Sequence, residues 1–244
     1  MKLKVTEFGA GEQLVVFVHG ALGSGRSFDR VAALLDDEFR ILYYDRRGYG
    51  ENAQAAVGGP VGVDTHIDDL IEILDGRHAV VIGHSFGGLT TLGAAVRAPE
   101  LVDALGAYET SMAWSPGWDD TVMRGVLAGP DPADAGLRLM LGERYDRMDD
   151  DERARRLVDA AAFAAEERSI RDRPPLYDVS EIRAPLVFGR SDPAVMPSVA
   201  AYLEENVPTM EIMELPGAGH HAHRSDPEGF ARLTRRASEL AASR

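Results

Sequence analysis

The sequence contains no cysteine. Disulfide bonds, thiol catalysis and zinc sites with cysteine ligands are therefore excluded. It also lacks an apolar run long enough to cross a bilayer, and no N-terminal segment has the basic start and apolar stretch of a secretory signal. These absences lead us to expect a cytoplasmic protein.

Positive charge is scarce, because 26 lysine and arginine residues face 40 aspartate and glutamate residues, for a net charge of −14. This balance disfavours binding to nucleic acid or to an anionic membrane surface. It also disfavours a polyanionic substrate, although a local site could still hold one carboxylate. The expected partner is a small-molecule substrate, and the sequence indicates no oligomeric state.

Short apolar segments alternate with segments of helical periodicity. The apolar runs are continuous, which is typical of strands buried on both faces of a parallel sheet. Expected strands are residues 14–20, 40–45, 78–84, 103–109, 184–192 and 210–217, with an antiparallel edge strand at 4–8. Expected helices are residues 27–36, 63–74, 87–98, 199–205 and 228–242. This order predicts an α/β fold with a mostly parallel, doubly wound sheet flanked by helices.

Residues 110–178 interrupt the alternation. They contain no strand-like run but three helical stretches, at 119–127, 133–148 and 151–171, separated by proline and glycine. Inserted before the penultimate strand, this segment predicts a helical cap over the C-terminal edge of the sheet; a long crossover connection is the alternative. The expected organisation is one structural unit, with a core of residues 1–109 and 179–244 and a cap of 110–178.

A serine lies where an expected strand meets an expected helix, in the motif Gly83-His84-Ser85-Phe86-Gly87. In this context the G-x-S-x-G pattern is typical of a nucleophile held in a sharp turn above the sheet edge. Side chains at the two glycine positions would clash where strand and helix approach. The amide of Phe86 lies at the helix N-terminus, where it can donate to an oxyanion. We therefore predict that Ser85 is a nucleophile.

A serine nucleophile needs a general base and an acid that orients this base. In such sheets the functional groups lie on loops beyond the C-terminal ends of the strands. The candidate acids on these loops are Asp45, Glu109 and Asp192. The candidate bases are His19, His84, His220, His221 and His223.

Position in the chain narrows these sets. His84 adjoins the serine, so we expect the turn to direct it away. His19 precedes a loop suited to donate a second amide, from Ala21, and we expect it to be structural. Asp192 directly follows a continuous apolar strand and is favoured over Glu109 as the acid. The residues alone do not choose among the three C-terminal histidines.

Four segments make the chain similar to the α/β-hydrolase fold superfamily, in its serine-nucleophile, esterase-like branch. They are FVHGALGSG (17–25), YYDRRGYGEN (43–52), GHSFGG (83–88) and FGRSDP (188–193). The resemblance implies the chain order nucleophile, acid, base, with the base directly after a glycine, here in the run GAGH (217–220). It therefore implies a triad of Ser85, Asp192 and His220, with His221 as the alternative base. It also implies structural roles for Asp45 and Arg47.

The reaction expected from this triad is hydrolysis of a small neutral or hydrophobic ester, lactone or thioester through an acyl-enzyme. The amides of Ala21 and Phe86 would hold the oxyanion, and neither a cofactor nor a metal is expected. Hydrophobic residues after the expected strands 14–20 and 103–109 are candidates for the substrate pocket. They are Leu22, Met112, Trp114, Trp118 and Met123.

Other functions fit the same framework. Hydrolysis of C–C bonds, lyase chemistry and cofactor-free haloperoxidase activity are alternatives, and so is a non-catalytic receptor for a small molecule. A metal hydrolase built on His220, His221 and His223 is disfavoured, because three ligands in one short loop without a distant fourth fit a tetrahedral site poorly.

Overall fold

The computed structural model describes residues 2–57, 59, 61–171 and 175–243, and these form a seven-stranded sheet in the order β1-β3-β2-β4-β5-β6-β7. β1 runs antiparallel to β3, and the other pairs are parallel. The strands are β1 Thr6–Phe8, β2 Leu14–Val18, β3 Arg40–Tyr44, β4 Ala79–His84, β5 Val102–Tyr108, β6 Leu186–Asp192 and β7 Met210–Pro216. The expected sheet is confirmed, including the antiparallel edge strand.

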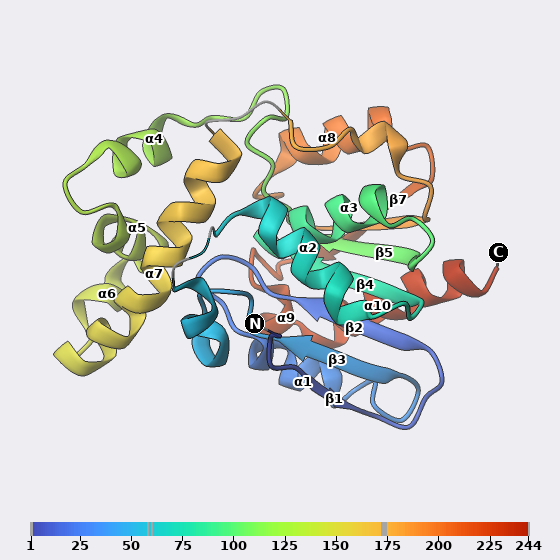
Figure 1. Ribbon diagram of the computed structural model, residues 1–244. Helices are drawn as coiled ribbons and strands as arrows, with labels where there is room; N and C mark the ends of the chain where they lie inside the picture. The colour runs from blue at the N-terminus through green and yellow to red at the C-terminus, as the bar shows by residue number, and fades with distance from the viewer. Residues whose placement is uncertain (1, 58, 60, 172–174, 244) are drawn as a thin grey trace.

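Helices cover both faces of the sheet (Figure 1). On one face, α2 (Val63–Leu74), α3 (Phe86–Arg97) and α8 (Pro197–Asn206) share a core with β2 and β4. On the other face, α1 (Asp29–Ala32), the 3₁₀ helix η1 (Gly25–Phe28) and α10 (Pro227–Ala242) pack against a second core. Burying one Leu, Val or Phe side chain contributes about 1.5–3 kcal/mol, so these two layers hold the sheet rigid.

Two short 3₁₀ helices, η2 (Gly50–Ala56) and η3 (Val179–Glu181), and α9 (Ala222–Ser225) lie in the connections. The expected helix at 27–36 is shorter than predicted, because η1 occupies its start and α1 spans only four residues. The last helix, α10, begins one residue before the expected 228–242: Pro227 is the first helical residue, and the Asp226 side chain accepts a hydrogen bond from the amide of Gly229.

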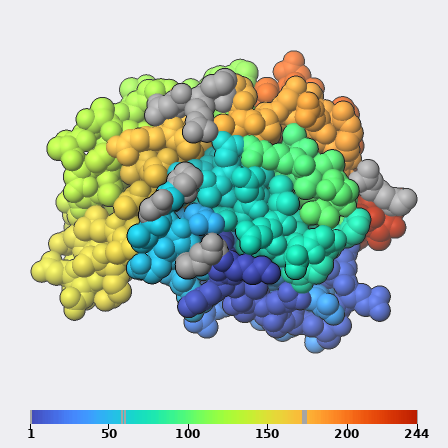
Figure 2. Space-filling model, in the orientation of Figure 1, coloured from blue at the N-terminus to red at the C-terminus, as the bar shows by residue number. Residues whose placement is uncertain are grey.

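Between β5 and β6, the described chain forms α4 (Thr121–Ala128), α5 (Pro132–Leu141), α6 (Glu143–Asp146) and α7 (Asp150–Arg171). Figure 2 shows this segment, in green and yellow, as one lobe beside the blue and cyan part of the surface. Its apolar cluster is shared with the core, because Phe163, Leu137 and Tyr145 belong to one cluster with Leu22 and Tyr49. The single helix expected at 133–148 is broken at Gly142, whose φ of +53° ends α5 and begins α6.

The C-terminal ends of the parallel strands bring their following loops together. The amide of Glu109, after β5, donates to the carbonyl oxygen of Gly189 in β6 at 3.0 Å. The hydroxyl of Tyr108 donates to the carbonyl oxygen of Gly219, after β7, at 2.8 Å. Residues far apart in sequence therefore meet at this edge. Among the described residues, no helix is long and apolar enough to cross a membrane.

Candidate active site

Ser85 occupies a sharp turn between β4 and α3, with φ +53° and ψ −121°. A non-glycine residue in this region is strained, and such strain persists where the surrounding structure fixes it. The surroundings here are tight: a Cβ on Gly83 would lie 2.5 Å from the Gly87 carbonyl oxygen, and one on Gly87 would lie 2.0 Å from that of Val18. The two motif glycines therefore have the steric role expected from the sequence.

Other residues near the serine turn also have positive φ angles. Among the described non-glycine residues, Leu22, Asp75, Ser85 and Glu109 have them. Asp75 ends helix α2, where a left-handed residue is common. The other three lie in the loop after β2, in the serine turn and directly after β5. Three strained residues thus gather at the sheet edge, which motivates a functional role for each.

The loop after β2 lies directly against the serine turn. A Cβ on Gly20 would be 2.9 Å from the Cβ of Ser85, so only glycine allows this approach. In the described part of the chain, no hydrogen bond uses the amide of Ala21 or Phe86. Two unpaired amides beside a nucleophile can stabilise an oxyanion.

His220 lies close to the serine turn. The ring centroids of His84 and His220 are 4.8 Å apart, and His84 Nε2 is 2.7 Å from the His220 carbonyl oxygen. Burial lowers the pKa of His220 to about 4, so the ring is neutral and can accept a proton at neutral pH. Its Nδ1 is buried and has no hydrogen-bond partner within the described residues. No hydrogen bond between Ser85 and His220 forms there either, which is common in enzymes without substrate.

The other four candidate bases have different surroundings. His84 contacts the His220 loop, because its Nε2 lies 2.7 Å from the His220 carbonyl oxygen. His19 is buried and structural, because Nδ1 lies 2.8 Å from the Gly20 carbonyl oxygen while Nε2 accepts from the Arg46 amide at 2.9 Å. The ring of His223 packs 5.0 Å from that of Phe28. His221 is exposed and precedes α9.

The two candidate acids near this edge differ sharply. Asp192 ends β6 with an exposed side chain, and its carboxylate accepts no hydrogen bond from the described residues. The Glu109 side chain is fully buried. Its Oε1 accepts from the amide and hydroxyl of Ser191 and from the Val195 amide, and its Oε2 accepts from the Met196 amide at 3.0 Å.

The charge of Glu109 influences the pKa of His220. It is the only acid among the influences on the pKa of His220, which it raises against the larger effect of burial. A carboxylate has about four lone-pair sites, so Oε2 of Glu109 keeps one free for the N–H of an imidazole. The sequence favoured Asp192; burial, strain and charge favour Glu109 as the group that orients His220.

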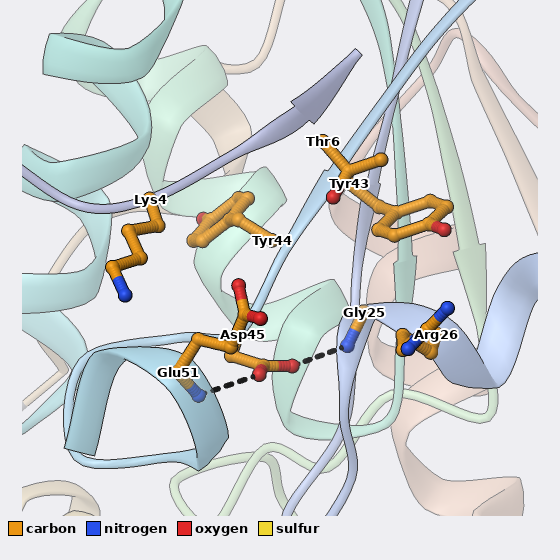
Figure 3. Close-up of a pocket in the computed structure, with 8 residues that line it drawn as sticks. All are labelled: Lys4, Thr6, Gly25, Arg26, Tyr43, Tyr44, Asp45 and Glu51. Atoms are coloured by element: carbon orange, nitrogen blue, oxygen red, sulfur yellow. Dashed lines mark hydrogen bonds between the residues drawn. The ribbon is translucent and has the colours of Figure 1, made fainter. Parts of the chain in front are cut away.

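The third candidate acid, Asp45, is structural, as the resemblance implied. Figure 3 shows its carboxylate between the amides of Gly25 and Glu51, which donate to it at 2.8 and 2.9 Å. The hollow in this view, about 220 Å³, includes neither Ser85 nor a histidine. Arg47 also has the expected structural role, because it pairs with Asp69 at 2.5 and 2.9 Å.

Arg46, whose importance the sequence did not reveal, anchors the helical segment to the loop after β2. Its guanidinium donates to the carbonyl oxygens of His19 and Gly20 and pairs with Glu166 of α7, and the side chains of Arg46 and Glu166 are fully buried. Glu166 also contacts His66 Nε2 at 2.6 Å and accepts from the Tyr49 hydroxyl at 2.7 Å. Although burial opposes it, Arg46 and His66 together hold the pKa of Glu166 down at about 2.

Replacing Arg46 with methionine is expected to lower the free energy of unfolding by about 3–5 kcal/mol, because Glu166 would remain buried without its main counter-charge. The measurement is urea unfolding followed by circular dichroism. Arg26→Met is the matched control. Arg26 is exposed, and its ion pair with Asp29 is long, at 3.7 Å, so it contributes little to stability. Adding Glu166→Leu to Arg46→Met should recover part of the loss. A loss below about 1 kcal/mol for Arg46→Met alone would contradict this role.

The hydrophobic pocket candidates lie in three environments. Met112 is fully buried in the core that α2 and α3 share, and Trp114 and Trp118 pack against it, while Met123 packs against the cluster of the helical segment. Leu22 lines a cavity of about 300 Å³ between the loop after β2, the C-terminal histidine loop and the helical segment.

The loop after β5 also contains buried polar groups that the sequence analysis did not predict. Buried polar atoms of five residues lack partners within the described part of the protein: Thr110, Ser111, Trp114, Ser115 and Trp118. Buried polar atoms normally have partners, so this group indicates a place for water or for polar parts of a substrate. The signal available in the sequence was the run of hydroxyl residues directly after Glu109.

The side-chain nitrogens of His84, His221 and His223 lie within 4.8 Å of one another and could contact a metal ion. This set differs from the one considered from the sequence, because His84 of β4 takes the place of His220. However, the cavity that these histidines line also contains Arg144, Arg156 and Arg224. Three guanidinium groups disfavour a cation there.

The geometry agrees with the comparisons to known proteins. The sequence profile of the alpha/beta hydrolase family matches residues 15–233. The chain belongs to the alpha/beta hydrolase family. A 2-(acetamidomethylene)succinate hydrolase from Mesorhizobium japonicum is 30% identical over 93% of this chain and 87% of its own length.

Solved structures support the same fold. A thermophilic esterase from Thermogutta terrifontis superposes with a TM-score of 0.76 at 18% identity, covering 98% of this chain and 93% of the esterase. MenH from S. aureus superposes with a TM-score of 0.75, also at 18% identity, covering 99% and 100%. At this identity the likeness concerns the fold alone. Together with the curated relatives, which are named hydrolases, the family membership identifies this chain as an alpha/beta hydrolase enzyme.

Proposed function

We propose that this alpha/beta hydrolase acts as a serine hydrolase on a small ester, lactone or thioester through an acyl-enzyme. The observation that carries the proposal is the strained turn of Ser85 beside the unpaired amides of Ala21 and Phe86. Ser85 Oγ bonds to the carbonyl carbon while His220 takes the hydroxyl proton. The two amides stabilise the negative charge that develops on the carbonyl oxygen.

The rest of the cycle returns the enzyme to its starting state. His220 gives its proton to the leaving oxygen or sulfur as the bond from that atom to the acyl carbon breaks. Water then loses a proton to His220 and attacks the acyl-enzyme, which releases the acid and restores the Ser85 hydroxyl. In place of Asp192, we propose that Glu109 orients His220 and stabilises its charged form. The helical segment of α4 to α7 serves as a cap over this site.

A series of activated esters and thioesters of increasing acyl length tests the proposal, with wild type and Ser85→Ala compared. Hydrolysis that depends on Ser85, with a preference for short chains, is the expected result. C–C hydrolysis, lyase and haloperoxidase chemistry, and a receptor role, are the alternatives. If no ester or thioester of the series is hydrolysed, one of these alternative functions is favoured.

The pH dependence of kcat/KM should reflect the lowered pKa of His220. His220 is the base only when it is neutral, so kcat/KM rises as pH rises through its pKa of about 4 and stays level from about pH 5.5 to 8. The measurement is kcat/KM for one activated ester in buffers of constant ionic strength. Circular dichroism at each pH must show folded protein. An acid limb centred near 6.5 would mean that His220 is solvated or is not the base.

The relative from Mesorhizobium japonicum is named for a succinate derivative, which carries two carboxylates. The sequence alone led us to expect a neutral or hydrophobic substrate. The name and the charges around the cavity favour an anionic group on the substrate instead.

A further inference from the structure

The cavity of about 300 Å³ lies at the meeting point of three parts of the protein. One wall is the loop after β2, including Ala21, whose amide is assigned to the oxyanion. A second wall is the histidine loop, with His221, His223 and Arg224. The third wall comes from α5, α6 and α7, which contribute Arg144 and Arg156 among others. Ser85 and His220 do not line this cavity, so Ala21 links it to the proposed oxyanion site.

The arginines of this cavity have few acidic partners. Within the described residues, the side chains of Arg156 and Arg224 make no hydrogen bond or ion pair. Arg144 has one contact, to Glu152 at 3.4 Å, and more than half of its side chain is exposed. The charge of Arg156 also acts on Asp159, whose carboxylate accepts a hydrogen bond from the Gly50 amide.

The three guanidinium groups line one cavity and repel one another. Burial lowers the pKa of Arg224, and the charges of Arg156 and Arg144 lower it further, with no acid acting against them. In a chain with a net charge of −14, such a group of like charges is unusual. An anion between them would relieve the repulsion and accept charge-assisted hydrogen bonds.

The histidines of the cavity add no compensating or competing charge at neutral pH. Burial lowers the pKa of His223 to about 3, and burial together with Arg224 lowers the pKa of His221. The positive charge of the cavity therefore comes from the arginines, which remain protonated throughout the working pH range. Their planar guanidinium groups match the two oxygens of a carboxylate.

We propose that Arg144, Arg156 and Arg224 form a carboxylate subsite, so that the preferred substrate carries a carboxylate on the side of its scissile bond that enters this cavity. The volume suits a small acid of a few carbon atoms rather than a long acyl chain. This inference rests on the proposed serine hydrolysis for its place in the reaction, but the subsite itself is a binding site and can be measured without turnover.

Two matched esters test the substrate class. The mono-4-nitrophenyl ester of succinic acid and 4-nitrophenyl butanoate have four-carbon acyl chains and differ in the terminal carboxylate. We expect wild type to have a KM about tenfold to a hundredfold lower for the succinate ester, as charge-assisted hydrogen bonds contribute in a partly buried site. Arg156→Met and Arg224→Met should remove this preference by raising the KM for the succinate ester to the level of that for butanoate. Arg147→Met is the control, because Arg147 is mostly exposed and pairs with Glu143.

Binding of succinate itself, measured by calorimetry on the same variants, separates the two proposals. Succinate binding that weakens about tenfold or more in Arg156→Met and Arg224→Met, without hydrolysis of either ester, supports the subsite and overturns the hydrolase assignment. Hydrolysis that depends on Ser85 but shows no preference for the carboxylate, with no succinate binding, overturns the subsite alone. Inorganic phosphate that binds more tightly than succinate to the same arginines would overturn the assignment to a carboxylate.

Discussion

Replacing Ser85 by alanine is expected to lower kcat for an activated ester by about 10⁶, the loss seen when the nucleophile of a serine hydrolase is removed. The serine turn should survive, because alanine has the same backbone restrictions as serine and the buried contacts of Gly83 and Gly87 stay in place. KM should change little, since Ser85 contributes to bond formation rather than to binding of the substrate. Burst and steady-state kinetics with a 4-nitrophenyl ester measure both quantities.

The control for this variant is Ser243→Ala, since Ser243 lies at the exposed end of α10 and its hydroxyl donates to a carbonyl oxygen within that helix. It should retain full activity. If Ser85→Ala keeps more than about one hundredth of wild-type kcat, a different group is the nucleophile or water attacks directly, since the oxyanion amides and binding alone supply only about 10³–10⁴ over the uncatalysed rate.

Replacing Glu109 by glutamine is expected to lower kcat by about 10³–10⁴, because the amide cannot stabilise the charged imidazole or hold its tautomer. Asp192→Asn should change kcat by less than about threefold, since the Asp192 side chain is exposed and has no hydrogen bond in the described structure. Glutamine keeps the shape of Glu109. However, it places an NH₂ group where the carboxylate now accepts hydrogen bonds from backbone amides. Some stability will therefore be lost, about 1–3 kcal/mol.

A purely structural role for Glu109 would lower the folded fraction of Glu109→Gln, but it would not lower kcat per folded enzyme. Thermal unfolding gives the folded fraction of each variant, and rates are expressed per folded enzyme. In a correctly folded Glu109→Gln enzyme, kcat falls while KM for the ester stays close to wild type. The reverse ranking, with Asp192→Asn losing about 10⁴ and Glu109→Gln nearly active, would restore the assignment that the sequence favoured.

Most of the fold could be predicted from the sequence, because continuous apolar runs and helical periodicity are local signals. The six expected parallel strands all form, and α2 has the predicted bounds, Val63–Leu74. Helix ends depended on single residues whose backbone angles the pattern does not show. Gly142 divides one expected helix into α5 and α6 for this reason.

The sequence points to candidate site residues where one short motif holds the proposed chemistry. Ser85 with its flanking glycines and the glycine before His220 are such motifs. The choice between the two candidate acids depends on burial and on which loop faces the imidazole, and a short motif shows neither. Asp192 and Glu109 both follow buried strands, and only the three-dimensional arrangement places Glu109 under the amides of the β6 loop.

Ion pairs between residues far apart in the chain could not be predicted from the sequence. Arg46 and Glu166 are separated by 120 positions, and nothing in either neighbourhood indicates a buried pair. The arginines of the cavity likewise come from α6, α7 and the loop after β7, so their approach follows only from how the helical segment lies against the core. The net charge of −14 pointed to neutral substrates because it averages over this local concentration.

Covalent labelling of Ser85 tests the central claim most directly. The intact mass of the protein is measured after exposure to a serine-directed fluorophosphonate, and the modified peptide is sequenced. We predict one adduct per chain, on Ser85, with loss of esterase activity in proportion to labelling and no adduct on Ser85→Ala. A fully labelled protein that keeps its activity, or an adduct on another residue in wild type, would contradict the proposal that Ser85 is the nucleophile.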